Sequence, residues 1–423
     1  MLDIKRLRED PEPFRVALAR RDLAERVDEL LAADARRREL TTRVEDLRAE
    51  QNKASKAIGA ATGDEKQRLI DEVGSVSAEI KELEPQLAEA EVSLDALLAA
   101  TPNLPDESAP DGGEDDAVEI RRNHDEPPSF DFEVRDHVAL GELLGVLDVD
   151  RGARTSGSRF VYLLGDIVLL QFALVRSAMD ILMQEDFTPV IPPVLVREEA
   201  MYGTGFLPAD EVNIYRTEQD ELYLVGTAEV PLAALHMGEI IEESQLPLRY
   251  AGYSTCFRRE AGSYGKDLGG MFRVHQFDKV EMFMFTTPEG SKDAHEFLLG
   301  VEEKILGKLE IPYRVVNIAV GDLGAPATKK YDIEGWLPAQ ERYRELTSCS
   351  NTTDYQARRL QTRVRRADGS LETLHTLNGT ATAIGRTLIA ILENHQRADG
   401  SVEIPEHLWQ YLPERVRVLE PTR

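Results

Sequence analysis

The sequence from Cys256 to Phe277 reads CFRREAGSYGKDLGGMFRVHQF. It begins as a strand that ends near Arg258, continues as a glycine-rich loop from Ala261 to Gly270, and returns as a second strand. The loop is therefore flanked by a cation on one side and by an aromatic ring, Phe277, on the other. Because a nucleotide presents anionic phosphates and a flat base, this arrangement favours a nucleotide site.

The segments around this hairpin alternate between helical and strand patterns. Residues from Gly165 to Glu185 have the pattern of a helix, and period-two alternation predicts a strand from Met271 to Phe285. The mixture predicts an α+β domain built on an antiparallel β-sheet flanked by helices. Prolines and glycines among acidic residues from Thr101 to Pro128 are typical of a linker. We therefore expect three parts, residues 1–101, 102–134 and 135–423.

Two long helical patterns dominate the first hundred residues. The second has apolar residues spaced alternately four and three positions apart, at Leu69, Val73, Val76, Ile80, Leu83, Leu87, Ala90, Leu94 and Leu97. The first has a matching seam from Leu40 to Ile58, interrupted by Gln51, and Gly59 and Gly63 lie between the two. The pattern predicts an antiparallel coiled-coil hairpin about 50 Å long. Its spacing fits both a dimerisation rod and a lever that reaches a distant partner.

The charge balance is acidic. Lys and Arg total 50 against 77 Asp and Glu, a net charge of −27, which is opposite in sign to that of most nucleic-acid-binding proteins. Two local basic runs stand out against this background, from Arg36 to Lys56 and from Arg358 to Arg366. Judged by composition alone, each run is best explained as the solvated face of a helix. The alternative is that its arginines and lysines contact phosphates.

The sequence gives no indication of secretion or of a membrane span. The N-terminus, MLDIKRLREDPEPF, lacks the apolar stretch of a signal peptide. The most apolar segment, Val161 to Val175, is broken by Asp166 and Gln171 and is shorter than the roughly 20 residues that cross a bilayer. The two cysteines, at 256 and 349, form no Cys-x-x-Cys pair. We expect a cytoplasmic protein that is not in a membrane.

Several segments resemble the motifs of class II aminoacyl-tRNA synthetases. Phe187–Pro193 (FTPVIPP) resembles motif 1, Cys256–Phe277 resembles motif 2, and Thr376–Thr380 (TLNGT) with Gly385–Asn394 (GRTLIAILEN) resembles motif 3. Thr227-Ala228-Glu229 matches the threonine-x-glutamate loop of seryl-tRNA synthetases. The order of arm, linker and motifs covers essentially the whole chain and is similar to that of the bacterial type of this family.

The resemblance implies a serine–tRNA ligase. Such an enzyme activates serine with ATP to seryl-adenylate and transfers it to the 3′ end of tRNA(Ser), and the family also serylates tRNA(Sec). It implies a homodimer formed through motif 1, a tRNA-binding N-terminal domain whose arm contacts the long variable arm of the tRNA, and a class II core over residues 135–423.

The resemblance also implies which residues bind ATP. Arg258 holds the α-phosphate and the serine carboxylate, Glu260 and Val274 contact the adenine, Phe277 stacks on it, and Arg386 reaches the γ-phosphate. Arg258 and Arg386 are the residues implied to be catalytic. The complete implied ATP set is Arg258, Arg259, Glu260, Val274, Phe277, Glu345, Leu346, Thr347, Ser348 and Arg386.

Serine and Mg²⁺ have their own implied ligands. Glu345 and Ser348 bind Mg²⁺ between the ATP phosphates, which suits hard oxygen ligands. The implied serine-binding residues are Thr227, Ala228, Glu229, Glu281 and Thr380. A small pocket lined by a carboxylate and a hydroxyl can reject alanine, because losing the substrate hydroxyl leaves buried polar groups unpaired.

The sequence departs from the family pattern at two places. Asp267-Leu268-Gly269-Gly270 stands where threonine-arginine-glycine usually follows the aspartate, so one cation near the acceptor stem is missing. Thr380-Ala381-Thr382 stands where serine-glycine-leucine is common. These departures motivate a rival hypothesis, a serine-activating enzyme with an acceptor other than tRNA. A third hypothesis, from a different class, is a catalytically inactive dimer that uses the coiled coil as a binding rod.

Overall fold

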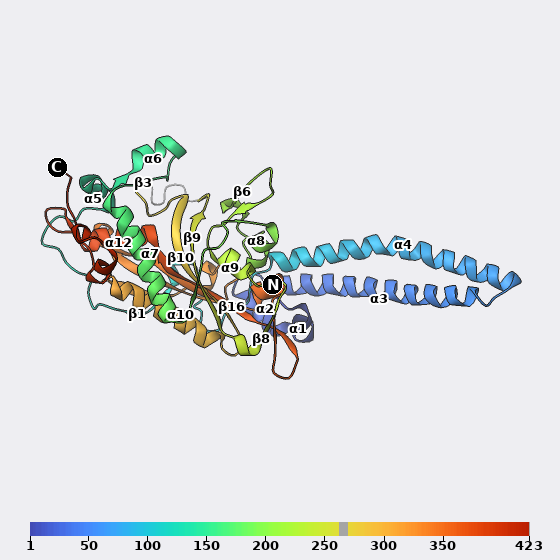
Figure 1. The fold of residues 1–423 in the computed structure, drawn as a ribbon. Coiled ribbons are helices and arrows are strands. Elements are labelled where there is room, and N and C mark those ends of the chain that lie inside the picture. Colours follow the sequence, from blue (N-terminus) through green and yellow to red (C-terminus); the bar gives the residue numbers. More distant parts are fainter. Residues whose placement is uncertain (262–269, 423) are drawn as a thin grey trace. The chain divides into compact units, whose positions relative to one another are not determined.

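The protein is described by a computed structural model that covers residues 1–261 and 270–422 (Figure 1). The chain divides into two compact units, Met1–Leu104 and Pro105–Arg423. Within the described part of the chain, no helix combines the length and the apolar character needed to cross a membrane.

The first unit is entirely helical. Its helices are α1 (Ile4–Glu9), α2 (Pro11–Ala19), α3 (Arg26–Ile58) and α4 (Gly63–Ala100). The two short helices pack at the base of the long pair, where a small core forms from Leu2, Leu7, Phe14, Leu18, Val27, Leu30, Leu94 and Leu98. Asp34 in α3 is buried there and is paired with Arg8 of α1 and with Arg37, at 2.8 Å in each case. The base of the arm therefore has a core of its own.

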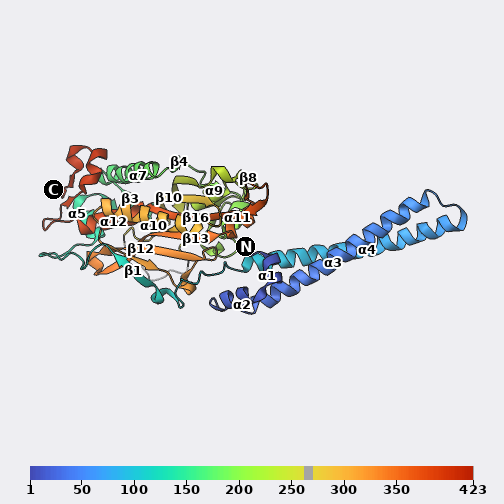
Figure 2. The ribbon, with the colours of Figure 1, turned by 90° about the horizontal axis from the view of Figure 1, so that it is seen from below.

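The predicted hairpin is confirmed. In both views α3 and α4 run side by side and are joined by one turn (Figures 1 and 2). The seam residues of both helices are buried or half-buried, with Leu47 packed against Val76 and Ile80. The polar interruption at Gln51 is satisfied, since its side-chain amide donates a hydrogen bond of 2.7 Å to the Ser77 hydroxyl. The heptad spacing thus predicted both the helices and their mutual faces.

The second unit is built on one large sheet, which confirms the predicted α+β class. The strand order is β1-β11-β12-β13-β16-β10-β9-β4, and all neighbours are antiparallel except β4 and β9. In sheet order the strands are Val118–Arg122, Tyr313–Asn317, Lys329–Leu337, Arg342–Thr353, His375–Ala383, Gln276–Thr286, Leu248–Phe257 and Thr188–Val190.

Helices pack against this sheet and complete its core. The helices of this unit are α5 (His137–Leu144), α6 (Val149–Ser156), α7 (Asp166–Gln184), α8 (Glu198–Thr204), α9 (Glu229–Ala234), α10 (Ser291–Lys308), α11 (Tyr355–Leu360) and α12 (Ile384–Asn394). The main core joins α7, α10 and α12 to the central strands through fully buried side chains such as Leu170, Leu298, Met282 and Leu388. Each such side chain stabilises the fold by about 2 kcal/mol.

Short elements surround the sheet. The described residues also form four small sheets. Two have three strands: β15 (Leu371–Thr373), β14 (Arg363–Arg365) and β8 (Ile240–Glu242) form one, and β5 (Leu195–Val196), β7 (Tyr223–Leu224) and β6 (Tyr215–Arg216) form the other. Two have two strands: β2 (Leu147–Asp148) pairs with β3 (Tyr162–Leu163), and β17 (Val402–Glu403) pairs with β18 (Val418–Leu419). The 3-10 helices are η1 (Glu114–Asp116), η2 (Glu211–Asn213), η3 (Glu243–Gln245), η4 (Val320–Asp322), η5 (Pro338–Gln340), η6 (Glu406–Tyr411) and η7 (Glu414–Val416).

Two local features differ from what the sequence pattern suggested. Part of the segment predicted as a linker forms β1, which pairs with β11 at one edge of the sheet. The strand predicted to begin at Met271 begins at Gln276 instead. Residues 271–274 leave the strand direction because Met271 and Phe272 are buried at the wall of a cavity.

Candidate active site

Most of the predicted site residues surround one cavity of about 560 Å³ in the second unit. This volume is in the range of small-molecule sites. The predicted residues that line it are Glu229, Arg258, Glu260, Val274, Phe277, Glu345, Leu346, Thr347, Ser348, Thr380 and Arg386. Thr227, Ala228, Arg259 and Glu281 are not among the lining residues, although Glu281 lies directly behind the wall, as described below.

The cation and the ring of motif 2 lie together. Strand β9 ends at Phe257, and the backbone N–H of Arg258 continues the ladder by donating to the His275 carbonyl at 3.0 Å. The Arg258 guanidinium donates to the Gly226 carbonyl at 3.1 Å and lies 5.3 Å from the centre of the Phe277 ring. The register of β9 and β10 therefore brings a positive charge and a flat ring to one wall of the cavity.

A second ion pair follows on the same wall. Glu260 has a left-handed backbone with φ of 50°, and its carboxylate accepts from Arg273 at 2.8 Å. Val274 is buried beside them. Arg259 does not join this group: its backbone N–H donates to the Asn213 carbonyl at 2.8 Å, and its side chain does not line the cavity.

Arg386 and Glu345 form the opposite charged group. Arg386 is the third residue of α12 and donates to the Glu345 carboxylate at 3.0 Å and to the Glu345 carbonyl at 2.9 Å. Enclosure in the cleft raises the pKa of Glu345, but the positive charges of Arg386 and Lys330 outweigh it and lower this pKa to about 2. Glu345 is therefore a carboxylate at any physiological pH.

A half-buried lysine that was not predicted from the sequence lies beside this pair. Lys330 lines the cavity and contacts Asp332 at 3.0 Å, and Asp332 is the cross-strand partner of Ser348. Burial raises the pKa of Asp332 to about 7, although the Lys330 charge opposes the shift. Lys330 and Asp332 share one face of β12 because they are two positions apart. The spacing of two residues within a strand was therefore the sequence signal that could have identified Lys330 and Asp332 as a pair.

The residues predicted for serine meet at the centre of the sheet. Glu281 of β10 and Thr380 of β16 are directly opposite each other in the register. Glu281 is fully buried and pairs with Lys279 at 2.5 Å, and its other oxygen accepts from the Asn378 amide at 3.4 Å. Lys279 and Asn378 also line the cavity, and neither was predicted as a site residue. The result is a polar recess with a carboxylate, an ammonium, an amide and a hydroxyl.

Glu229 closes this recess from α9. Its carboxylate accepts from the Gln356 amide at 2.7 Å, and its backbone N–H donates to the Thr227 hydroxyl at 3.2 Å. Burial, reinforced by the negative charge of Glu281, raises the pKa of Glu229 to about 7. Ala228 is fully buried beneath it. Thr227 and Ala228 therefore shape the backbone that presents Glu229.

A further carboxyl group, Glu302 of α10, lies beneath the recess. It is fully buried, and one oxygen accepts from the Thr347 hydroxyl at 3.1 Å. The other oxygen lies where a side chain on residue 379 would be, since a Cβ built on Gly379 falls 2.9 Å from it. Burial raises the pKa of Glu302 well above its usual value, and hydrogen bonds from Thr347 and from the Thr380 backbone only partly offset this.

Replacing Glu302 with Gln tests whether this group is neutral in the folded protein. Above about pH 4.5 the unfolded chain has released the proton while the folded protein keeps it, so the free energy of unfolding falls as pH rises until the folded-state pKa is reached. We expect the stability advantage of Glu302→Gln over the wild type to grow by about 1.4 kcal/mol per pH unit in this window. Thermal midpoints between pH 5.5 and 7.5 measure it.

The adjacent residue supplies the matched control. Glu303→Gln removes the same charge from the same helix, but Glu303 is paired with Arg121 at 2.6 Å. We expect no growing advantage with pH for that variant. A pH-independent difference between Glu302→Gln and the wild type would mean that Glu302 is ionised in the folded state.

Several other features bear on the sequence-based predictions. The departure at Asp267, Leu268 and Gly269 lies outside the described residues. The cavity is also lined by segments with no predicted role, namely Thr204–Phe206 and 324–327. Apart from Thr204, the last residue of α8, these residues lie outside helices and strands, and their short apolar and glycine-rich sequences carry no periodic signal.

Comparisons with known proteins agree with this geometry. Residues 1–105 match the family model of the seryl-tRNA synthetase N-terminal domain, and residues 212–395 match that of the tRNA synthetase class II core domain (G, H, P, S and T). The chain is 51% identical to a serine–tRNA ligase of Acidothermus cellulolyticus, with 100% of both chains covered. The chain belongs to the seryl-tRNA synthetase family.

Other relatives support the assignment. The serine–tRNA ligase of Streptomyces coelicolor is 50% identical over 100% of this chain and 99% of its own length. A crystal structure of the Pyrococcus horikoshii seryl-tRNA synthetase complexed with ATP has a TM-score of 0.93 and 43% identity, with complete coverage of both chains. The Naegleria fowleri cytoplasmic serine–tRNA ligase in complex with AMP has a TM-score of 0.88 and 33% identity, covering 100% of this chain and 99% of that one. As a member of this family, the chain is an ATP-dependent aminoacyl-tRNA synthetase.

Proposed function

We propose that this seryl-tRNA synthetase activates serine with ATP and transfers it to the 3′ end of tRNA(Ser). One observation carries the assignment of the site. Two guanidinium groups, Arg258 and Arg386, line a single cavity together with Thr380, and the cross-strand partner of Thr380, Glu281, is fully buried behind the wall. Such a cavity has cations for a triphosphate and a small polar recess for an amino acid.

ATP lies in this proposal with its base at the motif 2 wall. The adenine stacks on Phe277, with Val274 and Glu260 at its edge, and the α-phosphate is held by Arg258. The proximity of Arg258 to Phe277, 5.3 Å from guanidinium to ring centre, supports this, because the base is attached to the α-phosphate through one ribose. The γ-phosphate reaches Arg386, which is held by Glu345 at 3.0 Å.

Serine lies in the recess at the centre of the sheet. Its ammonium and hydroxyl groups contact Glu281, Thr380 and Glu229, and its carboxylate faces Arg258. The fully buried Glu281 supports selectivity, since alanine would leave buried polar groups without a partner. Threonine is excluded by the volume of its extra methyl group.

The chemistry of activation rests on positioning and charge. The serine carboxylate is already ionised at neutral pH and attacks the α-phosphorus in line, so no general base is needed. Arg258 neutralises the charge that develops at the α-phosphate, and Arg386 holds the departing pyrophosphate. In the second step the terminal ribose hydroxyl of the tRNA attacks the mixed anhydride and AMP leaves.

Mg²⁺ is part of the proposal. Glu345 supplies an ionised carboxylate oxygen, with a pKa near 2, and Ser348 supplies a hydroxyl on the same strand. Mg²⁺ is commonly held by one or two protein oxygens together with substrate phosphates, so this donor set fits it. The described residues hold no group of three or more His, Cys, Asp or Glu side chains that would bind a metal without a substrate. When bound, Mg²⁺ would neutralise phosphate charge.

The acceptor and the assembly complete the proposal. The arm formed by α3 and α4 binds the variable arm of tRNA(Ser), and tRNA(Sec) is a second proposed acceptor. Two copies form a homodimer through motif 1, which is supported by the exposure of Phe172 and Ile191, 57% and 87%. We propose the cytoplasm as the place of action.

The deciding experiment is the charging of purified tRNA(Ser) with labelled serine, ATP and Mg²⁺, beside reactions with alanine, with threonine and without Mg²⁺. We expect charging with serine alone and only when Mg²⁺ is present. Pyrophosphate exchange with serine but without charging would favour a different acceptor, and the absence of both would favour the inactive binding rod. A parallel reaction with tRNA(Sec) tests the second acceptor.

A further inference from the structure

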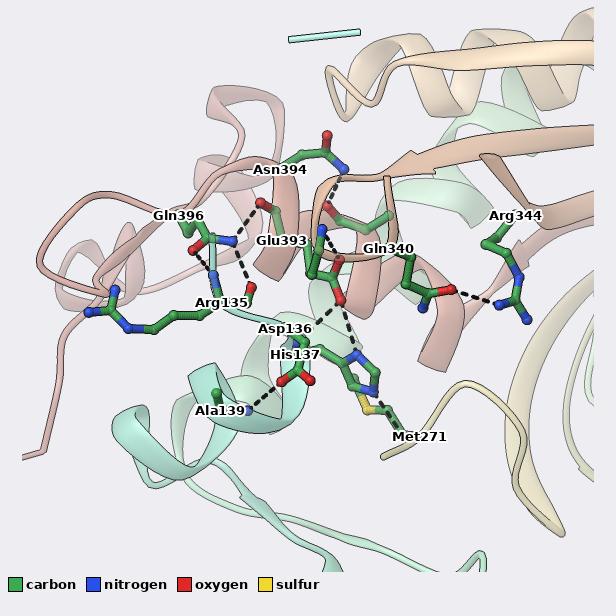
Figure 3. Close-up of polar contacts among 12 residues, drawn as sticks. Arg135, Asp136, His137, Ala139, Met271, Gln340, Arg344, Glu393, Asn394 and Gln396 are labelled. Atoms are coloured by element: carbon green, nitrogen blue, oxygen red, sulfur yellow. Dashed lines mark hydrogen bonds and ion pairs between the residues drawn. The ribbon is translucent and has the colours of Figure 1, made fainter. Parts of the chain in front are cut away.

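A histidine–carboxylate pair lies outside all the residues proposed to bind ATP or serine. His137 Nδ1 and Glu393 Oε1 are 3.1 Å apart, and the two side chains are 7% and 0% exposed. Figure 3 shows the imidazole between the Glu393 carboxylate on one side and the backbone of Met271 on the other. Neither His137 nor Glu393 was predicted from the sequence to have a role.

Glu393 connects three elements. It lies seven residues after Arg386 on α12, so the two side chains share one face of the helix about 10 Å apart along its axis. Besides the imidazole, its carboxylate accepts from the His137 backbone N–H at 3.2 Å and from the Ala339 backbone N–H at 3.3 Å. The carboxylate therefore ties the helix that carries Arg386 to the first turn of α5 and to η5.

The hydrogen bonds determine the protonation of the imidazole. The backbone N–H of Met271 lies 3.3 Å from Nε2 of His137, and a backbone amide can only donate. Nε2 is therefore the unprotonated nitrogen, and the proton is on Nδ1, where it points to the Glu393 carboxylate. The imidazole therefore accepts a hydrogen bond from Met271 and donates one to Glu393.

The contact between His137 and the Met271 backbone leaves no room for a side chain at the preceding residue, Gly270. Gly270 has φ of +71°, and a Cβ built on it would lie 2.0 Å from Nε2 of His137. The imidazole thus occupies the space next to the chain at the point where it returns to the cavity. His137 both supports and limits the path of residues 270 and 271.

The position of Met271 determines that of the next residue. The Phe272 ring lies 4.8 Å from the Arg386 guanidinium and 4.0 Å from that of Arg344. Arg344 in turn donates to the Gln340 side chain at 2.7 Å, in the same short helix as Ala339 (Figure 3). The contacts therefore form a ring. It runs from Glu393 through His137, Met271 and Phe272 to Arg386 and Arg344, and it returns to Glu393 through Gln340 and Ala339 of η5.

We propose that His137, oriented by Glu393, is a positioning residue for ATP: through Met271 it holds the Phe272 ring beneath the Arg386 guanidinium. This inference rests on the proposed role of Arg386. It predicts that the Nε2 contact matters for ATP and not for serine, because Phe272 and Arg386 lie on the triphosphate side of the cavity.

Two substitutions separate this role from simple structural support. In Asn, the side-chain amide stands at the place of Nδ1 and keeps the donor toward Glu393, but nothing accepts from Met271. In Gln, the terminal oxygen reaches the place of Nε2 and accepts from Met271. We expect His137→Asn to raise the KM for ATP about tenfold, as the loss of one buried hydrogen bond would, with the KM for serine unchanged within about twofold. His137→Gln should stay within about threefold of the wild type for both substrates.

Pyrophosphate exchange with full titrations of ATP and serine measures these values, beside thermal midpoints. His395→Asn is the control: His395 follows α12 directly and contacts the Leu309 carbonyl at 3.0 Å, so its loss lowers stability without touching Met271. Equal effects of His137→Asn and His137→Gln, or none from His137→Asn, would overturn the inference. Arg386→Ala is measured in parallel, since a normal KM for ATP in that variant would instead contradict the proposed ATP placement.

Discussion

Replacing Arg258 with Ala is expected to lower kcat/KM for serine-dependent pyrophosphate exchange about 1,000-fold. The Arg258 guanidinium is proposed to neutralise charge at the α-phosphate, and removal of a single preorganised donor of this kind costs about 100- to 1,000-fold in rate. A 1,000-fold loss corresponds to about 4 kcal/mol of transition-state stabilisation. Arg258→Lys should recover part of the activity, because it restores the charge but not the planar fork.

Arg249 is the matched control for this experiment. It lies on β9, the strand that leads to Arg258, and its guanidinium also lies over an aromatic ring, Phe297, at 4.5 Å. It does not line the cavity. Arg249→Ala should therefore leave kcat/KM within about threefold of the wild type. A similar loss in both variants would show that the effect comes from damage to β9, and full activity of Arg258→Ala would contradict its proposed role.

Shortening the arm is expected to abolish tRNA charging while sparing serine activation. Removing residues 44–80 and closing the gap with a short glycine-rich turn deletes the outer half of α3 and α4. The base core, which includes Phe14, Leu30 and Leu94, is retained. Because the lost surface is proposed to contact tRNA phosphates, we expect charging at low tRNA concentration to fall by roughly 100-fold or more. Exchange should stay within about twofold.

Replacing only exposed lysines of the arm tests whether the loss of tRNA charging comes from the loss of positive charge. Several arginines of the basic run are already paired with acids, such as Arg43 with Glu79 at 2.5 Å. Lys53 and Lys56 are exposed and form no ion pair within the described ranges. Substituting both with Gln should reduce the dependence of tRNA affinity on salt by about one unit of log–log slope per lysine. Normal charging by the shortened protein would favour the other open interpretation, a dimerisation rod.

The arm was predictable because its determinants are local. A heptad spacing of apolar residues indicates both that a segment is helical and which of its faces packs against the partner helix. This spacing alone therefore places Leu47, Val76 and Ile80 together. The hairpin from Cys256 was similarly readable, since a strand, a turn-forming segment and a returning strand follow each other in sequence. Both cases depend on neighbours that are close along the chain.

The parts that were missed depend on distant packing. Glu302 lies on a helix and approaches the serine recess from beneath the sheet, 78 residues before Thr380, and no local pattern marks it. The start of β10 was misplaced because the alternation of residues 271–274 continues that of the strand, whereas His137 holds Met271 out of it. Lys279 is a different case: its position two residues before Glu281 on one strand would have identified the pair.

The edge strand β4 has a consequence for the behaviour of the protein at high concentration. An uncovered sheet edge offers its free N–H and C=O groups to strands of other molecules, which is a common route to aggregation. Pro189 occupies the middle of β4 and lacks an N–H, and Pro192 and Pro193 come one residue after the strand ends. A foreign strand therefore finds an interrupted ladder at this edge. The prolines that resemble a family motif thus also disfavour the addition of a strand from another molecule at this edge.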